Sequence, residues 1–379
     1  HAAFFADFMA ERKQDIRTNR QLDALALIDP DFENVRVAWL YTMDRQAWDS
    51  LPKFLHSLWF YVDVRTRGQE AVALFEYAVK ALQSAPSSDA TELALGRLLA
   101  RLGWFYNDIG SFGNADATCD EAIRILRKYD SPEDLIAALH ERQNTPDRIG
   151  QQDIGLSYTQ EGLNIGRKVG DKYWESYLLL WAGYLRNNFH RDFVSARYFA
   201  EEALAVFETL GDDWGLMRTY HVLGEVNLNL RDYETAKRWF QQQQRLDEAF
   251  GHMFSTATLL SIQASIALIE RQYATARQGL TKSLRRFWDG GYQYMAPYVL
   301  TYFVRLFADQ NEFERAVGIL GTLQNYPLTL WQVDQTTEAM RDELLSKLEA
   351  ERFAAAWARG EGRELSALVA ELLADPADA

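Results

Sequence analysis

The chain has 379 residues, a length that usually divides into several compact cores unless the chain consists of repeats that pack only on their neighbours. Its net charge of −14 is spread along the sequence without a run of lysine and arginine, which argues against a basic face for direct contact with nucleic acid. The single cysteine, Cys119, excludes a disulfide framework and is expected to be a buried packing residue.

The longest apolar run, Tyr177 to Leu185, is too short to span a membrane, and no signal peptide precedes the first predicted helix. We therefore expect a soluble cytoplasmic protein without membrane contact. His1 leads directly into an apolar helical pattern, and we interpret the chain as a segment of a longer one.

The first part of the chain, residues 1–44, is predicted to be a helical lead-in. A helix over Ala2 to Lys13 is followed by a break and by a second helix that begins at Asp31. The first helix pair is predicted at Leu51 to Val64 and Gln69 to Gln83. A small polar loop, Ser84 to Asp89, then leads into the regular part of the chain.

An aromatic-x-x-Ala pattern recurs every 40 residues in the second half of the chain. It occurs at Phe193–Ala196, Tyr233–Ala236, Tyr273–Ala276 and Phe313–Ala316. Small residues at helical spacing let one helix approach its neighbour closely, and a fixed period of this length is typical of helical solenoids. Continued towards the N-terminus, the series predicts seven second helices, marked by Ala71, Ala115, Gly155, Ala196, Ala236, Ala276 and Ala316.

A second series supports this phase. Glycines recur where each second helix should end, at Gly170, Gly211, Gly251 and Gly291. Glycine accepts the left-handed conformation that closes a helix, and an aspartate directly after it is a good N-cap for the next helix. We predict an all-α, right-handed superhelical solenoid of helix-turn-helix repeats, with seven repeats over residues 45–325.

Three further features of the sequence refine the predicted repeats. Two Leu-Gly pairs, Leu102-Gly103 and Leu223-Gly224, are expected where the first and second helices touch, and Gly183 holds a similar place. The unit over Ser131 to Gly170 is the weakest, and its first helix is expected to end early because of Pro146. Residues 326–379 are predicted to form a helical cap and a frayed tail, with helices over 335–348, 351–358 and 364–373.

With the Leu-Gly, aromatic-x-x-Ala and Gly-Asp positions in place, the chain resembles tetratricopeptide repeats. The lengthened interval is similar to that in sensor domains of bacterial signal-transduction (STAND-type) ATPases. The segments His1–Phe8 and Asp31–Ala38 resemble the region that follows the winged helix in that family, and Glu351–Gly360 resembles its closing segment. The resemblance implies a sensor arm whose parent carries a nucleotide-binding module and an effector, as in the LuxR-type regulator of the maltose system.

The sequence contains no catalytic motif. There is no Gly-x-x-x-x-Gly-Lys-Ser/Thr phosphate loop, and His140-Glu141 is followed by Asn144 where the zinc motif His-Glu-x-x-His needs its second histidine. We therefore expect no enzyme activity, no cofactor and no metal site in this chain, although the parent implied by the resemblance is an ATPase.

A ligand site is predicted on the concave side, which the first helices line. Aromatic rings beside amides and carboxylates suit a sugar, a peptide or another ligand with a polar face, because rings supply stacking area and amides fix orientation. For each residue alone, packing between repeats is the competing interpretation. The predicted positions are Phe60, Trp104, Asn107, Asp108, Tyr177, Tyr184, Asn187, Asn188, His221, Glu225, Asn229, Ser261, Ser265, Tyr298 and Tyr302.

Two functions remain open from the sequence. In the first, an inducer (a small molecule, a peptide or a protein) binds in the groove and releases restraint on the nucleotide module of the same parent chain. In the second, the groove or the convex face holds a protein partner constitutively, as a plain interaction scaffold. A closed pocket in the groove would favour the first, and an open trough with a broad patch would favour the second.

Overall fold

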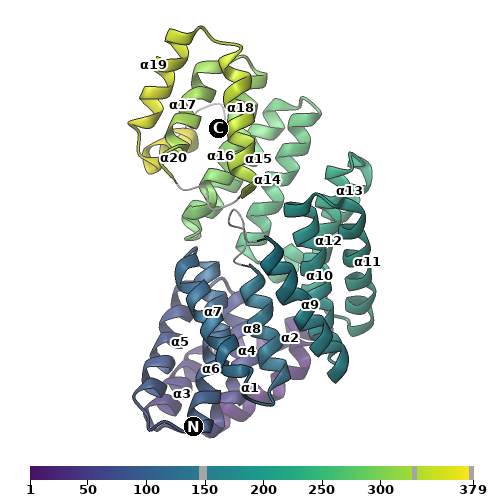
Figure 1. Ribbon diagram of the computed structural model, residues 1–379, viewed down its shortest axis with the longest axis vertical. Helices are drawn as coiled ribbons and strands as arrows, with labels where there is room; N and C mark the ends of the chain where they lie inside the picture. Colours follow the sequence, from purple (N-terminus) through teal and green to yellow (C-terminus); the bar gives the residue numbers. More distant parts are fainter. Residues whose placement is uncertain (145–151, 327–330, 375–379) are drawn as a thin grey trace. The chain divides into compact units, whose positions relative to one another are not determined.

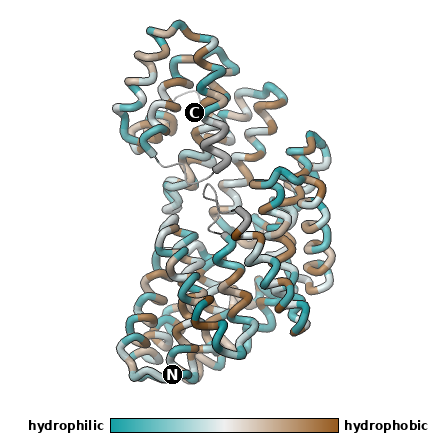
Figure 2. Tube along the Cα trace, in the orientation of Figure 1, coloured by the Kyte–Doolittle hydropathy of each residue, from teal (hydrophilic) through white to brown (hydrophobic). Residues whose placement is uncertain are grey.

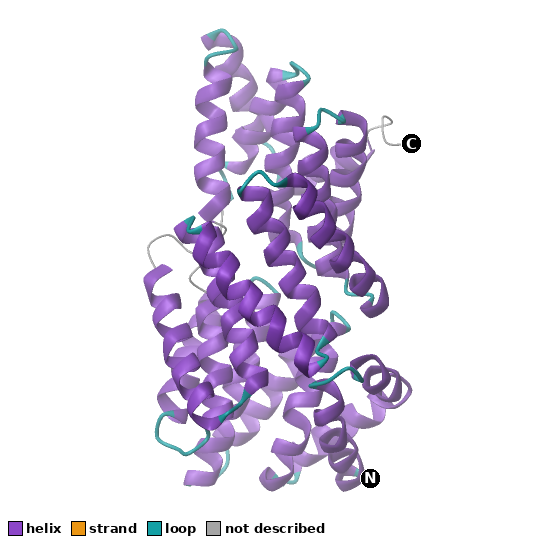
Figure 3. Ribbon diagram, turned by 90° about the vertical axis from the view of Figure 1, so that its right-hand side faces the viewer, coloured by secondary structure: helices purple, strands orange, loops and turns teal. Residues whose placement is uncertain are grey.

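The computed structural model describes residues 1–144, 152–326 and 331–374, and all regular structure in these residues is helical (Figure 3). The contacts divide the chain into two compact units, the first ending at His252 and the second beginning at Met253. Each helix carries both hydrophobic and hydrophilic residues (Figure 2). None of the described helices is long and apolar enough to cross a bilayer.

The first unit holds the helices α1 to α13, labelled in Figure 1. Short 3-10 turns, η1 and η2, precede α3 and α4, and a π-helix, η4, follows α10. The bounds are α1 Ala2–Ile16, α2 Gln21–Ile28, η1 Asp29–Asp31, α3 Phe32–Asp44, η2 Trp48–Ser50, α4 Leu51–Val64, α5 Gly68–Gln83, α6 Asp89–Asp108, α7 Phe112–Leu126, α8 Pro132–Asn144, α9 Gln152–Val169, α10 Lys172–Leu185, η4 Arg186–His190, α11 Phe193–Leu210, α12 Asp213–Asn229 and α13 Tyr233–Phe250.

The second unit holds the last two predicted pairs and the C-terminal helices. Its helices are α14 Met253–Ile269, α15 Tyr273–Asp289, η5 Gln293–Met295, α16 Ala296–Asp309, α17 Phe313–Leu323, α18 Trp331–Leu345, α19 Ala350–Glu361 and α20 Leu365–Ala374. Helices α17 and α19 approach very closely, because a Cβ built on Gly360 would lie 2.0 Å from the carbonyl oxygen of Gly318. The predicted boundaries at residues 44 and 325 stay predictions.

The alanine series is confirmed as the contact stripe of the second helices. Its members lie in α5, α7, α9, α11, α13, α15 and α17. The six alanines are fully buried, and Gly155 is buried as well. Each first helix packs on the second helix that follows it, as in α6 with α7, α10 with α11 and α12 with α13. The sequence therefore predicted both the TPR-like pairing and its phase.

The glycine series is confirmed by backbone geometry. Gly170, Gly211, Gly251 and Gly291 have φ of +73°, +70°, +67° and +86°, the left-handed region in which glycine carries no steric cost. Asp171 and Asp212 are the N-caps of α10 and α12, and their carboxylates accept hydrogen bonds from the backbone N–H groups of Trp174 and Gly215.

A third recurring feature, with steps of 40 residues from Arg191 onwards, occurs at the described turns inside the pairs and was not predicted. The residue five positions before each marker alanine has a positive φ, from +52° at Thr66 and Arg191 to +76° at Gly110. Because different residue types occupy these positions, the recurrence is not visible in the sequence. The full set is Thr66, Gly110, Arg191, Arg231, Arg271 and Asn311.

Helix α8 is described as far as Asn144, and Pro146, where the sequence predicts an early end of this helix, lies outside the described residues. The described helices also correct the lead-in. Helix α1 runs to Ile16, three residues beyond the predicted end at Lys13, and α2 was not predicted.

The lead-in helices contact the beginnings of three later first helices. Lys13 pairs with Glu133 in the first turn of α8 at 2.9 Å, and Arg17 lies 3.8 Å from Asp171, the N-cap of α10. The buried Gln21 donates to the Asp212 carboxylate at 2.7 Å and accepts from the backbone N–H of Trp214 at 2.9 Å. The lead-in is therefore part of the core of the first unit.

Candidate functional site

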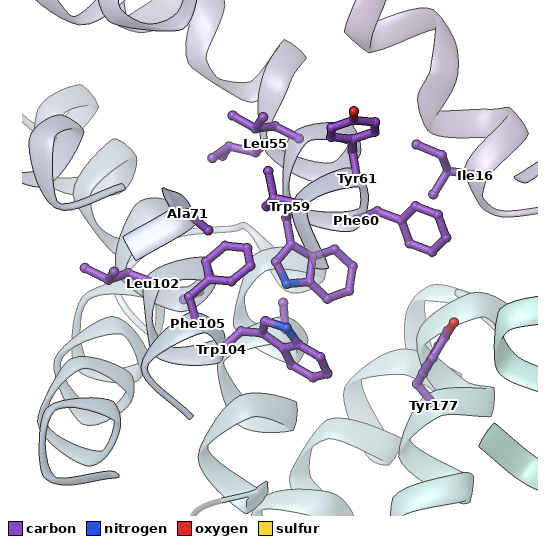
Figure 4. Close-up of a cluster of buried hydrophobic side chains, with 14 of the residues drawn as sticks. Ile16, Leu55, Trp59, Phe60, Tyr61, Ala71, Leu102, Trp104, Phe105 and Tyr177 are labelled. Carbon is purple, nitrogen blue, oxygen red and sulfur yellow. The ribbon is translucent and has the colours of Figure 1, made fainter. Parts of the chain in front are cut away.

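Three of the predicted site residues, Phe60, Trp104 and Tyr177, are buried inside the first unit (Figure 4). The Phe60 ring lies 6.0 Å from Trp214 of α12, and Tyr177 meets Phe207 edge-on at 4.9 Å. These contacts are packing between repeats, the competing interpretation that the sequence allowed for each of these residues. A role for the three in direct ligand contact stays a prediction.

Trp104 belongs to a group of rings that we call the aromatic cluster, contributed by the first helices α4, α6, α8 and α10. Trp104 meets Trp59 edge-on at 5.6 Å and stacks on His140 at 6.2 Å. His140 in turn lies 5.6 Å from Trp174 and 5.8 Å from Trp181. Such ring pairs stabilise a core beyond their buried area. The cluster consists of Trp59, Trp104, His140, Trp174, Tyr177 and Trp181.

Two guanidinium groups lie on these rings. The Cζ atom of Arg101 is 5.4 Å from the Trp59 ring and 5.7 Å from the Trp174 ring. Arg218 lies 5.2 Å from Trp104 and 5.6 Å from Trp181. Cation–π attraction strengthens where water is excluded, so both arginines are held by the cluster.

Two carboxyl groups near the cluster have raised pKa values. Burial raises the pKa of Asp63 to about 7, against the opposing effects of Arg218 and of the Trp104 indole, whose Nε1 donates to Asp63 Oδ1 at 2.8 Å. Burial, with a smaller contribution from Asp63, raises the pKa of Asp108 to about 8. Asn107 donates weakly to the Glu141 carbonyl at 3.5 Å. Asp63 near the end of α4 and Asp108 at the end of α6 are thus carboxyl groups whose pKa values lie near neutral pH.

Five of the predicted residues form one polar network, four of them joined by hydrogen bonds, which we call the amide ladder. Asn229 Nδ2 donates to Asn187 Oδ1 at 3.0 Å, and Asn187 donates to Asn188 at 3.2 Å. Asn188 donates to Glu225 at 3.5 Å, and His221 Nε2 lies 3.6 Å from the same carboxylate. The structure thus brings together predicted residues from η4 and from α12, which lie about one repeat apart in the sequence. The ladder consists of Asn187, Asn188, His221, Glu225 and Asn229.

The ladder extends to the second helix of its repeat. His221 Nδ1 lies 3.3 Å from Gln243 Oε1, and Gln243 donates to Asp247 at 3.2 Å. Gln243 and Asp247 are buried, whereas Asn229 is exposed and His221 and Glu225 are half-buried. The network therefore runs from the surface into the interface between α12 and α13.

The π-helix η4 carries Asn187 and Asn188, and both side chains are buried. Single π turns are rare and often occur at functional sites, because the wider turn frees backbone and side-chain groups from the regular pattern. Arg191, with φ of +52°, ends the turn, and the Asp192 N–H closes it on the Arg186 carbonyl at 3.0 Å. Tyr184 lies just before the turn and meets Trp181 edge-on at 4.7 Å.

The remaining predicted residues belong to the second unit and are described separately. Tyr302 donates its hydroxyl hydrogen to the Tyr298 hydroxyl at 3.0 Å, and both rings are half-buried. Ser261 and Ser265 are buried, and their hydroxyl groups bond within the unit. A cavity of about 290 Å³ lies in this unit, but its lining is a different set that includes Phe307, Arg315, Ile319, Arg359, Arg363 and Leu372.

Sequence reasoning missed Trp59, Arg101, His140, Trp174, Trp181 and Arg218. One signal was present, because Trp174, Tyr177, Trp181 and Tyr184 follow one another at steps of three and four residues, which places them on one helix face. The arginines gave no signal, since their importance depends on rings from other repeats. Within the described part of the chain no group of histidine, cysteine and carboxylate side chains is arranged to hold a metal ion.

The family comparison identifies one repeat directly. Residues 218–250 match the tetratricopeptide-repeat family model. These residues span α12 and α13, which carry His221, Glu225 and Asn229 of the amide ladder. A search of curated proteins finds no match to the sequence.

Several solved structures are similar in fold. A Rap protein in complex with Competence and Sporulation Factor has a TM-score of 0.52 at 12% identity, over 92% of this chain and 100% of that one. A STAND protein with a tetratricopeptide-repeat sensor, from Pyrococcus horikoshii, has a TM-score of 0.48 at 16% identity, over 85% of this chain and 49% of that one. At these identities the likeness to Rap shows the fold alone, an all-helical array of TPR-like repeats.

Proposed function

We propose that the chain is the ligand-sensing arm of a signal-transduction ATPase and that its ligand is an extended peptide bound along the amide ladder. The ladder supports this proposal because it gathers amides, an imidazole and a carboxylate from η4 and from the neighbouring first helix α12. The segments at the two ends of the chain support the regulatory part through their resemblance to this family.

A peptide suits the ladder for a chemical reason. Each asparagine side chain offers both a donor and an acceptor, the pair that a peptide group also offers, so an amide can bond to an extended backbone without regard to its side chains. Trp181 and Tyr184 precede η4 on α10 and meet edge-on, and in this proposal their rings supply surface for an apolar side chain of the ligand. The Rap structure was determined with Competence and Sporulation Factor bound, and a peptide on this chain would be the equivalent use of a similar fold.

The ladder could also convey a signal. It connects η4, α12 and, through Gln243, α13, so a ligand that rearranges its hydrogen bonds changes the contact between two repeats. A ligand shifts such an equilibrium only by its difference in affinity for the two arrangements, and couplings of about 1–3 kcal/mol are typical. A few charge-assisted and amide hydrogen bonds are sufficient for that magnitude.

The first experiment identifies the ligand class. A positional-scanning library of synthetic pentapeptides is added to the purified chain, and binding is followed by thermal shift and then by titration calorimetry. Pools that bind the wild type are expected to lose affinity for Asn188→Ala and for the exposed Asn229→Ala. Asn164→Ala is the matched control, because Asn164 is an exposed asparagine on α9, outside the ladder. If none of the pools binds the chain, the proposal that its ligand is a peptide is contradicted.

The second experiment tests the sensor role against the scaffold. In the full-length parent protein, Tyr184→Ala combined with His221→Ala is expected to raise the inducer concentration needed for activation while the melting temperature stays close to that of the wild type. If the folded double variant is activated at the same inducer concentration as the wild type, the ladder does not take part in signalling. The interaction-scaffold function is then favoured.

A further inference from the structure

The cavity of about 290 Å³ in the second unit is lined by side chains of α16, α17 and α19, of the turn that follows α19, and of α20. Its space is available partly because Gly318 of α17 has no side chain. A Cβ built on Gly318 would lie 3.8 Å from the Ala356 carbonyl oxygen and meet no other described atom within 4 Å. Part of the cavity thus lies where an ordinary side chain of α17 would otherwise be.

The floor of the cavity is apolar. Four of its lining side chains are at most 3% exposed, namely Phe307, Ile319, Leu368 and Leu372. Ligand sites commonly combine such an apolar surface with a few polar groups that fix the orientation of the ligand. An engineered cavity of ~150 Å³ holds benzene, so a cavity of twice that size has room for about ten non-hydrogen atoms.

The rim of the cavity carries two exposed carboxylates, and each already has a cation beside it. Glu314 pairs with Arg352 at 2.9 Å, and Glu371 pairs with Arg363. Neither carboxylate therefore leaves an uncompensated negative charge at the rim.

One cation of the lining lacks a counter-ion. Arg315 pairs with Glu312 at 2.8 Å, and its Cζ atom lies 4.0 Å from the centroid of the Phe307 ring. Arg359, in the last turn of α19, is exposed, and it has no ion-pair or hydrogen-bond partner in the described part of the chain. A guanidinium group presents its donors in a planar fork that matches the two oxygens of a carboxylate. The cavity thus joins an apolar floor to one unpaired guanidinium group.

We propose that this cavity binds a small aliphatic monocarboxylic acid, with its carboxylate on Arg359 and its hydrocarbon chain against Ile319 and Leu372. A single negative charge matches the single unpaired guanidinium, whereas a phosphate monoester brings about two charges. Because the lining joins α16 and α17 of the last predicted pair to α19 and α20, the bound acid would also hold the C-terminal helices on that pair. The proposal concerns the second unit and does not depend on the peptide at the amide ladder.

The test compares two ligands that share one hydrocarbon chain. The complete chain is titrated at neutral pH and constant ionic strength with octanoate and, separately, with 1-octanol, and binding is followed by calorimetry and by melting temperature. We expect octanoate to bind saturably at one site and to raise the melting temperature. Octanol should bind about two- to fivefold more weakly, the range expected from an ion pair at the surface.

Three variants assign this binding to the cavity. Arg359→Gln should reduce the affinity for octanoate to that for octanol and leave octanol binding unchanged. Arg341→Gln is the matched control, because Arg341 is also an exposed arginine of the second unit but lies on α18, outside the lining. Gly318→Leu should fill the cavity and abolish the binding of both ligands, while helix propensity keeps its melting temperature at or above that of the wild type.

A wild type that shows no saturable binding of octanoate overturns the proposal. Equal octanoate affinities in Arg359→Gln and Arg341→Gln also overturn it, because the carboxylate would then not be held by Arg359. Full octanoate binding by a folded Gly318→Leu variant would place the acid elsewhere. If Gly318→Leu does not fold, the two arginine variants still decide the outcome, since both replace exposed side chains.

Discussion

The contact between Leu223-Gly224 and the second helix of its repeat gives a quantitative test of the repeat packing. A Cβ built on Gly224 would lie 2.3 Å from an edge carbon of the Phe240 ring, and the ring is 1% exposed. Gly224→Ala should gain about 1 kcal/mol from helix propensity. The displaced ring should cost about 1–3 kcal/mol through overpacking, and the short distance favours the upper part of that range. We expect a net loss of about 1–2 kcal/mol.

A double-mutant cycle isolates the contact. Phe240→Leu alone should destabilise the chain, but less than the ~3–5 kcal/mol typical of Phe→Ala. Combined with Gly224→Ala it should cost less than the sum of the single changes, with a coupling of about 0.5–3 kcal/mol, because the smaller side chain leaves room for the new methyl group. Gly113→Ala is the control, since no atom lies within 4 Å of its built Cβ, and this variant should be neutral or slightly stabilised.

Unfolding in urea, followed by circular dichroism, supplies these differences. Strict additivity of Gly224→Ala and Phe240→Leu, or a Gly224→Ala variant as stable as Gly113→Ala, would refute the close contact. The register that the alanine series predicts would then lose its main energetic support.

Three further predictions concern other parts of the chain. Arg231→Gly should raise the urea midpoint by the equivalent of about 0.5–1 kcal/mol, because φ of +64° strains a non-glycine residue; a lower midpoint contradicts this. The Asp63 carboxyl keeps its proton in the folded chain up to a pKa of about 7 but loses it near 4 in the unfolded chain, so wild-type stability should fall as pH rises through this window. Asp63→Asn should weaken that fall, and parallel pH profiles for the two proteins would show that Asp63 is not buried as described. Gly360→Ala should release α19 from α17, because its Cβ would meet the Gly318 carbonyl, and limited proteolysis should then cleave before α20; unchanged protease resistance contradicts the close crossing.

The repeat phase could be predicted from the sequence because close helix contacts admit only small residues. Ala196, Ala236 and Ala276 are fully buried on second helices whose most extensive contact is with the first helix that precedes them. The positive φ at Arg191 and Arg231 could not be predicted, since backbone strain at a turn does not select a single residue type there.

The site was predictable where its residues follow the helical spacing or the repeat spacing. The spacing of His221 and Glu225 on one helix, and of Asn188 one repeat earlier, is visible in the sequence and led to the amide ladder. Arg101 contacts Trp59 in the neighbouring repeat and Trp174 two repeats further on, and the contact of Gln21 with Asp212 joins the lead-in to α12. No local pattern specifies them, because they depend on how the repeats of the first unit curve towards one another.

Hydrogen exchange with and without a bound peptide tests the central proposal most directly. The chain is incubated with the pentapeptide selected from the library, and exchange is resolved by mass spectrometry over η4, α12 and the outer surfaces of α11 and α13. We expect slower exchange at the end of α10, in η4 and in α12, and the same peptide should give no protection in Asn188→Ala. Protection confined to the outer faces of α11 and α13, with η4 unchanged, would contradict a ligand on the amide ladder and identify the chain as an interaction scaffold.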